Sequence, residues 1–340
     1  MNSAPPDLHD LACVVHLHST FSDGTGTVPE IVRAARRTAA DVVLLTDHNT
    51  LAARDSRYEG WHDGVLLLVG EEVTPRRENH YLAFGVDRAV DWGDGSPAAI
   101  CAAVTAAGGF GFAAHPWSQG SPLFERATPM PWRDIDCDGL TGVELWSFIN
   151  DVGPEVRSAR DALRLIARPD RFLTDPPAEN LRDWDRLNAA GRRVVGIGGL
   201  DSHQVGKRLF NRWVIRPIGY HRTFRLLRTH VLCEEAPTGE VGHDREQVYA
   251  ALRDGRCYIA ADAHAPARGF AFWRDGATIH ARAPRRAELR VIRNGAVVHA
   301  VDGEELGYEP GEPGAYRVEA HLVVEGRRRT WILSNPIVVR

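Results

Sequence analysis

Clusters of histidine, aspartate and glutamate are the residues of this chain that could do chemistry. They occur as His16-x-His18, Ser22-Asp23-Gly24, Thr46-Asp47-His48, Gly70-Glu71-Glu72, His80, Ala114-His115-Pro116 and Asp201-x-His203. Imidazole and carboxylate groups together suit Zn²⁺, Mn²⁺ or Fe²⁺. Residues two apart in an extended chain point the same way, so both members of an H-x-H or D-x-H pair can reach one ion. The pattern predicts a centre of divalent metal ions.

No single cluster carries this prediction. An isolated H-x-H or D-x-H pair is weak support for a metal site. Lone histidines such as His62, His221 and His299 are usually exposed or hydrogen-bonded, and we assign them no role. All of the clusters together, each beside a predicted strand, are much harder to explain without a metal.

The elements that must position these clusters are short apolar strands. Strands are predicted over residues 13–16, 42–46, 65–69, 80–86, 110–114, 142–146 and 194–197, and helices over 29–40, 96–107 and 178–190. Near-continuous apolar runs are typical of strands covered on both faces. Their alternation with helices predicts an α/β fold with a mainly parallel sheet, open or closed into a barrel. In such folds active sites form at the carboxyl ends of strands, where most of the clusters lie.

The pattern changes after about residue 262, where helix-compatible runs stop. Strands punctuated by Gly and Pro are predicted over 269–273, 278–283, 288–293, 296–300, 314–324 and 330–333. Asn294-Gly295 is a strong hairpin signal. We expect two domains, one over residues 10–262 that carries the clusters and a small all-β sandwich over residues 263–340.

Composition excludes several classes of protein. Apolar residues make up 44% and charged residues 25%, which is typical of a soluble protein with a core. The formal net charge of −4 argues against a basic surface for duplex nucleic acid. The five cysteines form no C-x-x-C pair, so we expect neither a disulfide framework nor a zinc ribbon. With no basic leader and no apolar run of about 18 residues, we expect no signal peptide, no membrane span and a cytoplasmic location.

The clusters resemble the motifs of the PHP family, named for polymerase and histidinol phosphatase, in both order and spacing. The resemblance covers roughly residues 10 to 260. It implies a distorted (β/α)7 barrel with two or three metal ions. The segments Ala251-Leu252-Arg253-x-Gly255-Arg256-x-Tyr258-Ile259 and Trp331-Ile332-Leu333-Ser334-Asn335-Pro336-Ile337 are similar to the CehA/McbA-like subgroup, which is named for a carbamate hydrolase.

The resemblance also implies how the metals are held. It assigns His16, His18, Glu72 and Asp201 to one ion, Glu72, His80 and His115 to a second, and Asp23, His48 and His203 to a third where it is present. Glu72 would bridge, and its neighbour Glu71 is the rival, because only one of two adjacent strand residues can point inward. Asp23 leaves open whether two or three ions bind. We also expect Asp23 and His203 to act in catalysis.

The expected chemistry is hydrolysis by a metal-activated hydroxide. Divalent metal ions, of which Zn, Mn and Fe all fit, lower the pKa of a bound water from 15.7 towards about 7. A phosphoesterase acting on a small phosphorylated compound is favoured. A carbamate, amide or ester hydrolase with the same centre is the alternative, and a non-catalytic metal-binding module is a further one.

Several residues are candidates for contact with the substrate. Lys207, the only lysine, and Arg208 follow His203 and could bind phosphate. Glu144, at a strand end, could contact substrate or support a ligand. Trp117 and Trp146 suit stacking on a base or an aryl group, although tryptophan is often simply core. The role of the sandwich and the oligomeric state stay open.

Overall fold

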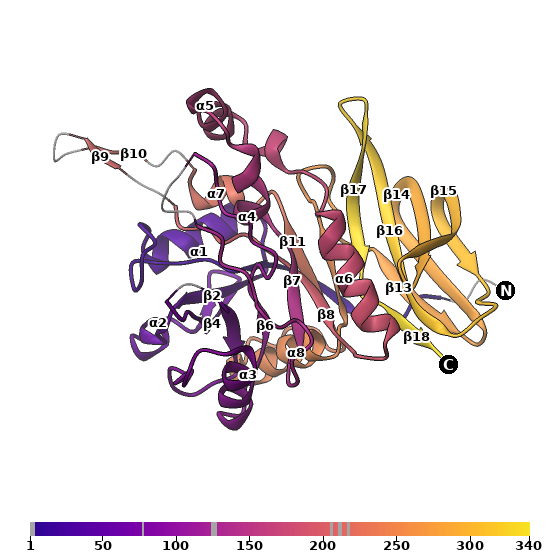
Figure 1. Cartoon of the computed structure of the whole chain (residues 1–340), viewed down its shortest axis with the longest axis horizontal. Helices are drawn as coiled ribbons and strands as arrows, with labels where there is room; N and C mark the ends of the chain where they lie inside the picture. The colour runs from indigo at the N-terminus through magenta and orange to yellow at the C-terminus, as the bar shows by residue number, and fades with distance from the viewer. Residues whose placement is uncertain (1–3, 77, 124–127, 205–206, 210–212, 216–217) are drawn as a thin grey trace.

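The structure is a computed structural model in which short strands alternate with helices and an all-β segment follows (Figure 1). It describes residues 4–340 except 77, 124–127, 205–206, 210–212 and 216–217, and for 207–209 and 213–215 it describes the backbone alone. The strands of the first part are β1 (His9–Val15), β2 (Val42–His48), β3 (Gly60–His62), β4 (Val65–Val73), β5 (Tyr81–Phe84), β6 (Phe110–Ala113), β7 (Gly142–Ser147), β8 (Val195–Gly199), β9 (Lys207–Leu209), β10 (Trp213–Ile215), β11 (Arg228–Cys233) and β12 (Cys257–Ala260).

The helices are all in this first part of the described chain. They are α1 (Val28–Arg37), α2 (Ala52–Asp55), α3 (Pro97–Ala106), α4 (Phe148–Val152), α5 (Ala159–Ala167), α6 (Ala178–Ala189), α7 (Tyr220–Thr223) and α8 (Val241–Arg253), with 3-10 turns η1 (Gly153–Glu155) and η2 (Pro169–Phe172). The start of α1 follows its sequence: the backbone N–H of Thr27 donates to Glu30 Oε2 at 2.9 Å, and Pro29 occupies the first turn.

Alternate residues of the strands enter two different cores. Val43 and Leu45 of β2 pack with residues of α1 and α3, whereas Val42 and Leu44 pack with residues of α8. This follows from the two-residue period of a strand. Both faces of the strand are therefore buried, as its continuous apolar run predicts.

The sheet is mixed rather than mainly parallel. β1 with β2, β2 with β4, β6 with β7 and β7 with β8 are parallel, whereas β1 with β11, β4 with β5 and β5 with β6 are antiparallel. The prediction of a mainly parallel sheet is wrong at β5, because only the seven residues 74–80 lie between the end of β4 at Val73 and the start of β5. A connection that short cannot hold the crossover that a parallel pair requires.

The expected closure into a (β/α)7 barrel is not shown, because the strand ladder ends at β8. At β8, side chains take the place of a neighbouring strand. The Thr229 hydroxyl pairs with both the N–H and the C=O of Gly198, at 2.9 and 2.8 Å. The Asn335 amide does the same for Gly196, at 2.7 and 3.0 Å. These side chains satisfy backbone groups of β8 that no second strand pairs with, and the sheet stays open at this edge.

From residue 271 onward the described elements are all strands. They are β13 (Ala271–Asp275), β14 (Thr278–Arg293), β15 (Ala296–Tyr308), β16 (Gly314–Val324), β17 (Arg327–Ser334) and β18 (Ile337–Val339). They enclose a core of their own that includes Tyr316, Trp331 and Leu289. Their ladder continues into the first part through β12 and β17, where Ile259 pairs with Leu333. The boundary at residues 262 and 263 therefore stays a prediction.

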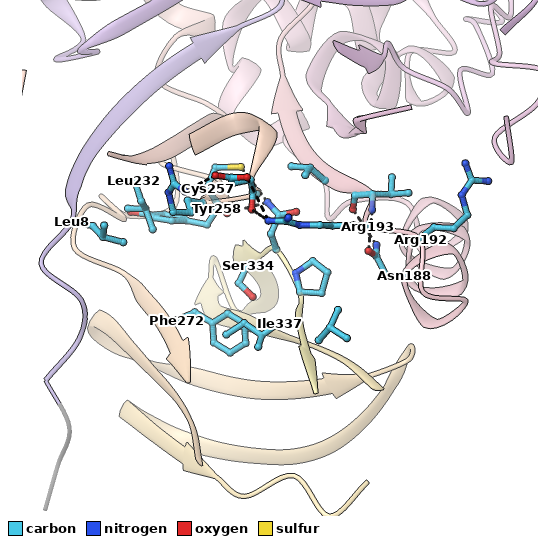
Figure 2. A pocket seen from close by; sticks show the side chains of 18 of the residues that line it. Leu8, Asn188, Arg192, Arg193, Leu232, Cys257, Tyr258, Phe272, Ser334 and Ile337 are labelled. Atoms are coloured by element: carbon cyan, nitrogen blue, oxygen red, sulfur yellow. Dashed lines mark hydrogen bonds and ion pairs between the residues drawn. The ribbon is translucent and has the colours of Figure 1, made fainter. Parts of the chain in front are cut away.

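A cavity of about 560 Å³ lies where these strands meet the first part (Figure 2). Cys257 and Tyr258 of β12 lie on one side of it, and Phe272 and Ile337 of the C-terminal strands on the other. None of the predicted metal ligands lines it. The five cysteines are buried and free. No helix of the described chain is both long and apolar enough to cross a membrane.

Candidate metal centre

The predicted ligands come from the ends of the central strands. His16 and His18 follow β1, His48 closes β2, Glu72 lies near the end of β4, His80 precedes β5, His115 follows β6, and Asp201 and His203 follow β8. All except Asp23, His48 and His203 are buried. The structure gathers all nine predicted ligands at one end of the curled sheet.

Three of the ligands have a left-handed backbone. The φ angles of His16, His115 and Asp201 are 62°, 32° and 49°. Non-glycine residues adopt this conformation rarely, at a cost of about 1–3 kcal/mol each, and such strain gathers at functional sites. Each of these residues stands one or two positions after a strand, where the turn sends its side chain back over the strand ends.

The loop after β8 is fixed against the loop after β1. Leu200 N donates to Val15 O at 3.0 Å, and Ser202 N donates to His16 O at 3.2 Å. In return His18 N donates to Ser202 O at 3.0 Å. These bonds bring the D-x-H pair of residues 201 and 203 against the H-x-H pair, 185 positions apart in sequence from Asp201 to His16.

The nine side chains form three groups, in each of which the potential ligand atoms lie within 4.8 Å of one another. The groups are His16, His18, Glu72 and Asp201; Glu72, His80 and His115; and His18, Asp23, His48 and His203. Their membership follows the assignment that the resemblance implies, with His18 as an addition to the third group. Glu72 belongs to two groups and His18 to two, so these residues join the three positions.

Glu72 is the centre of the arrangement because its two oxygens face different imidazoles. Its Oε2 faces His16 Nε2 and His18 Nε2 at 3.3 Å each and His48 Nδ1 at 3.1 Å, and its Oε1 faces His80 Nδ1 at 2.8 Å and His115 Nε2 at 3.3 Å. A carboxylate in this position can bridge two ions. Glu71 points the other way, where its Oε1 accepts from Val90 N at 2.7 Å.

The buried atoms of the centre fit divalent metal ions. His16 Nε2, both ring nitrogens of His18, Glu72 Oε2 and His115 Nδ1 are buried and make no hydrogen bond to any described residue. Leaving a buried polar atom without a partner costs about 1–3 kcal/mol. Imidazole nitrogens and carboxylate oxygens that converge in this way, several of them without a hydrogen bond, are the donor set that Zn²⁺, Mn²⁺ or Fe²⁺ uses.

The charges of the carboxylates also fit. Burial raises the pKa of Glu72, but His16 and His80 lower it more, so the net pKa lies well below its usual range. For Asp201 burial acts in the same way and is outweighed by His16 and His203. Burial and the nearby His203 lower the pKa of His18 to about 4, which leaves a neutral imidazole. Anionic carboxylates and a neutral imidazole are the states that ligate metal.

The third group lies at the open side of the centre. The side chain of Asp23 is 58% exposed and those of His48 and His203 are 24% exposed, whereas Glu72 is 1% exposed. Asp23 Oδ1 lies 3.2 Å from His203 Nε2 and 3.5 Å from His48 Nε2. A substrate that enters from solvent therefore meets this group first.

Glu144 supports the ligands from behind. It is 1% exposed, its Oε1 lies 2.9 Å from His16 Nδ1, and its Oε2 accepts from His115 N at 2.7 Å. Of the two roles that the sequence left open, this geometry matches the supporting one. Partners of this kind fix the ring orientation of a ligating histidine.

Other supporting residues escaped the sequence analysis. Asn150 Nδ2 donates to Asp201 Oδ2 at 2.9 Å, and Thr74 Oγ1 lies 2.7 Å from His48 Nδ1. Asp47 accepts from Ser19 N at 2.7 Å and Ser22 Oγ at 2.6 Å, which holds the loop before Asp23. Asp47 sits inside the T-D-H motif and could have been found there. Asn150 and Thr74 carry no sequence signal, because their approach depends on the curl of the sheet.

The predicted substrate contacts are less settled. Lys207 and Arg208 lie in β9, which pairs with β10 in a separate two-stranded sheet, and their side chains fall outside the described residues. Figure 1 shows this hairpin extending away from the body. Trp146 is 1% exposed and belongs to the core, so the prediction that Trp146 could stack on a substrate is wrong. Trp117 is half-buried, and its Nε1 donates to Asp183 at 3.1 Å.

The sequence matches no family profile and no curated protein, whereas several solved structures are similar to the chain. A two-domain protein from Bacteroides vulgatus with a predicted PHP-like metal-dependent phosphoesterase is 15% identical, with 99% of this chain and 98% of that one covered and a TM-score of 0.47. A protein from Bifidobacterium adolescentis proposed to be a metal-dependent phosphoesterase is 21% identical, covering 59% and 89%, with a TM-score of 0.35.

An amidohydrolase from Chromobacterium violaceum is 18% identical, covering 56% and 87%, with a TM-score of 0.31. These similar structures are thus described as metal-dependent phosphoesterases and an amidohydrolase. None of the three is described as CehA/McbA-like, so the subgroup stays a prediction. With TM-scores below 0.5, none of them carries the functional argument, which depends on the geometry of the centre.

Proposed function

We propose that this chain is a metal-dependent hydrolase, and that it acts as a phosphoesterase on a small phosphorylated compound. One observation carries the proposal: three groups of ligands share Glu72 and His18 within one cluster. Adjacent positions of this kind suit ions that act together on one substrate. A purely structural metal site is a closed set of about four ligands and has no need of shared ones.

Divalent ions bound there would act as Lewis acids and lower the pKa of water towards about 7. The chain itself supplies the proton-handling groups at the open side. His203 favours its protonated form. Burial lowers the pKa of His203, but Asp201 and Asp23 raise it more, so the net pKa lies above its usual value. His203 Nε2 can hold a proton facing Asp23 Oδ1 at 3.2 Å. With the two buried groups filled, this pair would transfer protons to and from the substrate.

The choice of a phosphoester rests on the resemblance to PHP phosphoesterases and on the shared, multinuclear arrangement of ligands. Two adjacent ions can contact both the attacking and the leaving oxygen of a phosphoryl group. The finer assignment to the CehA/McbA-like subgroup would instead favour a carbamate or related acyl substrate. The two readings share the centre and differ in the bond cleaved.

The first experiment tests the metal centre with a matched pair of variants. Glu72→Gln should lose most of the bound metal and the hydrolytic activity, since it removes the bridging carboxylate. Glu71→Gln changes the adjacent residue, where burial raises the pKa to about 7 and the side chain faces Val90. It should keep both metal and activity. Elemental analysis of the purified proteins gives the metal content, and full activity without metal in Glu72→Gln would overturn the proposal.

The second experiment identifies the bond. Hydrolysis of p-nitrophenyl phosphate and p-nitrophenyl acetate is measured side by side on metal-loaded protein. Preference for the phosphate supports the phosphoesterase, and preference for the acetate supports the acyl hydrolase. A metal-loaded protein inactive on both and on a wider panel of phosphorylated and acylated compounds would indicate a non-catalytic metal-binding module.

A further inference from the structure

A second polar cavity, of about 790 Å³, lies apart from the candidate metal ligands. It is formed by the end of α1, the start of η2, α7 with the residues after it, and the segment after β12. Its charged lining is Arg37, Arg222, Arg225, Arg228, Arg268, His221, His230, Asp170 and Asp262. None of the nine predicted metal ligands is among the residues that line it. Five arginines against two aspartates make this cavity strongly positive.

Several of these charged side chains form ion pairs, but the pairs do not cancel the net positive charge of the cavity lining. Asp170 pairs with Arg168, which lies outside the cavity, at 3.0 Å. Asp262 pairs with Arg228 at 3.2 Å, and Arg268 pairs with Asp41.

Two of the lining arginines have no partner among the described residues. Arg37 and Arg225 are exposed, and neither makes a hydrogen bond or an ion pair with any residue that the structure describes. Two guanidinium groups are thus available to an anion at no cost to an existing pair.

The arginines stand close together around α7. Burial lowers the pKa of His221, and the positive charges of Arg225, Arg222 and Arg37 lower it further. Three arginines from two segments therefore act on one imidazole. α7 packs against α1 (Figure 1), and Arg37 of α1 lines the same cavity as His221 and Arg222 of α7. Tertiary packing has gathered like charges here, an arrangement that costs energy unless an anion compensates it.

One wall of the cavity includes a buried histidine. His230 is 1% exposed, and its Nδ1 lies 2.7 Å from Asp10 Oδ1. Its Nε2 makes no hydrogen bond to the described residues, although it faces Asp262 Oδ1 at 3.5 Å. His230 thus lies between Asp10 and Asp262 and is held in the wall by these two carboxylates, which leaves the contacts with an anion to the exposed arginines.

We propose that this cavity binds a small compound with two phosphate groups, such as a diphosphate. Guanidinium groups bind phosphate oxygens through paired, charge-assisted hydrogen bonds. A volume of about 790 Å³ exceeds what one phosphate needs and lies within the range of small-molecule sites, about 300–1,000 Å³. The inference goes beyond the proposed function, because the site shares no ligand with the metal centre.

Pyrophosphate is the probe that tests this site, with binding to the full-length protein measured by isothermal titration calorimetry. Arg37→Ala and Arg225→Ala should each weaken the binding about tenfold or more, since each removes a charge-assisted contact. Arg33→Ala is the matched control, because Arg33 is an exposed arginine one turn before Arg37 on α1 and does not line the cavity. Inorganic phosphate should bind more weakly than pyrophosphate.

The outcomes separate this site from the metal centre. Pyrophosphate binding that weakens about tenfold or more in Arg37→Ala and Arg225→Ala, while p-nitrophenyl phosphate hydrolysis is kept, supports the proposal. Pyrophosphate binding that is lost only in Glu72→Gln takes place at the metal centre, and this result overturns the proposal. Equal weakening in Arg33→Ala would show a general charge effect and also overturn it, as would the absence of any pyrophosphate binding. Circular dichroism checks that each variant is folded.

Discussion

Two buried polar clusters in this chain differ in whether their charges are paired. The first, which we call the arginine cluster, centres on Arg317 and is distinct from the arginine-lined cavity. It joins α6 to β16 and consists of Asp185, Arg317, Glu319 and His321. Arg317 donates to both oxygens of Asp185 at 2.7 and 2.8 Å and to Glu319 Oε1 at 2.6 Å. His321 Nε2 lies 2.9 Å from Glu319 Oε2. Every charge in this cluster has a partner within the protein.

The metal centre is also largely buried, but its polar atoms are not all paired within the described part of the protein. Its carboxylates and imidazoles converge, but several of their atoms make no hydrogen bond to the described residues. Its backbone is strained at three ligands, whereas no residue of the arginine cluster has a positive φ. A buried cluster that is complete by itself stabilises the fold, and one that is incomplete and strained is built to bind something.

The largest expected effect is at the metal centre. Asp201→Asn should lower hydrolytic activity by more than about 100-fold, because even residues that only support metal ligands are worth about 10–100-fold. It should also lower the metal content without unfolding the protein. Elemental analysis and kinetics on the same preparation check this. A variant with full metal and full rate would remove Asp201 from the ligand set.

The same kind of change in the arginine cluster should affect stability instead. Arg317→Met leaves Asp185 buried without its cation and Glu319 with His321 alone, which should cost about 3–5 kcal/mol of unfolding free energy. Metal content of the folded fraction should stay at the wild-type level. Urea unfolding measures the first quantity. Loss of metal at wild-type stability would erase the contrast between the two clusters.

The arginine cluster should also make stability depend on pH in acid. Burial raises the pKa of Glu319, but His321 and Arg317 lower it more, to about 2 from 4.5. Because the folded pKa is the lower one, the stabilisation is complete above pH 4.5 and disappears as pH falls through 2. It amounts to about 3 kcal/mol. Urea midpoints between pH 2 and pH 6 should fall less steeply in Glu319→Gln than in the wild type.

The smallest effect is expected where the metal centre most resembles the arginine cluster. Glu144 uses both carboxylate oxygens, on His16 and on the amide of His115. Glu144→Gln turns one acceptor into a donor that faces another donor, and should reduce metal affinity about 10–100-fold. Titration with Zn²⁺ and Mn²⁺ measures this. Unchanged affinity would show that the ligands orient themselves without Glu144.

The sequence predicted most of the central elements and all nine residues that the structure gathers. Apolar runs located β2, β4, β6 and β7 to within a few residues, because burial on both faces leaves a continuous apolar signature. Period-two alternation allowed only one of Glu71 and Glu72 to point inward, and the resemblance selected Glu72. β11 and β12 were missed as strands, and the predicted strands 278–283 and 288–293 proved to be one, β14.

What the sequence by itself determined is therefore local: which residues carry chemistry, and which strand ends hold them. Tertiary structure alone decided how those ends meet. Thr229 and Asn335 satisfy backbone groups at the free edge of β8, and backbone hydrogen bonds between the loops after β8 and β1 bring Asp201 and His203 to the H-x-H pair. The tertiary structure also brings Asn150 to Asp201 and Glu144 to His16. These contacts join positions more than 50 residues apart, and no local pattern encodes the path of the backbone between them.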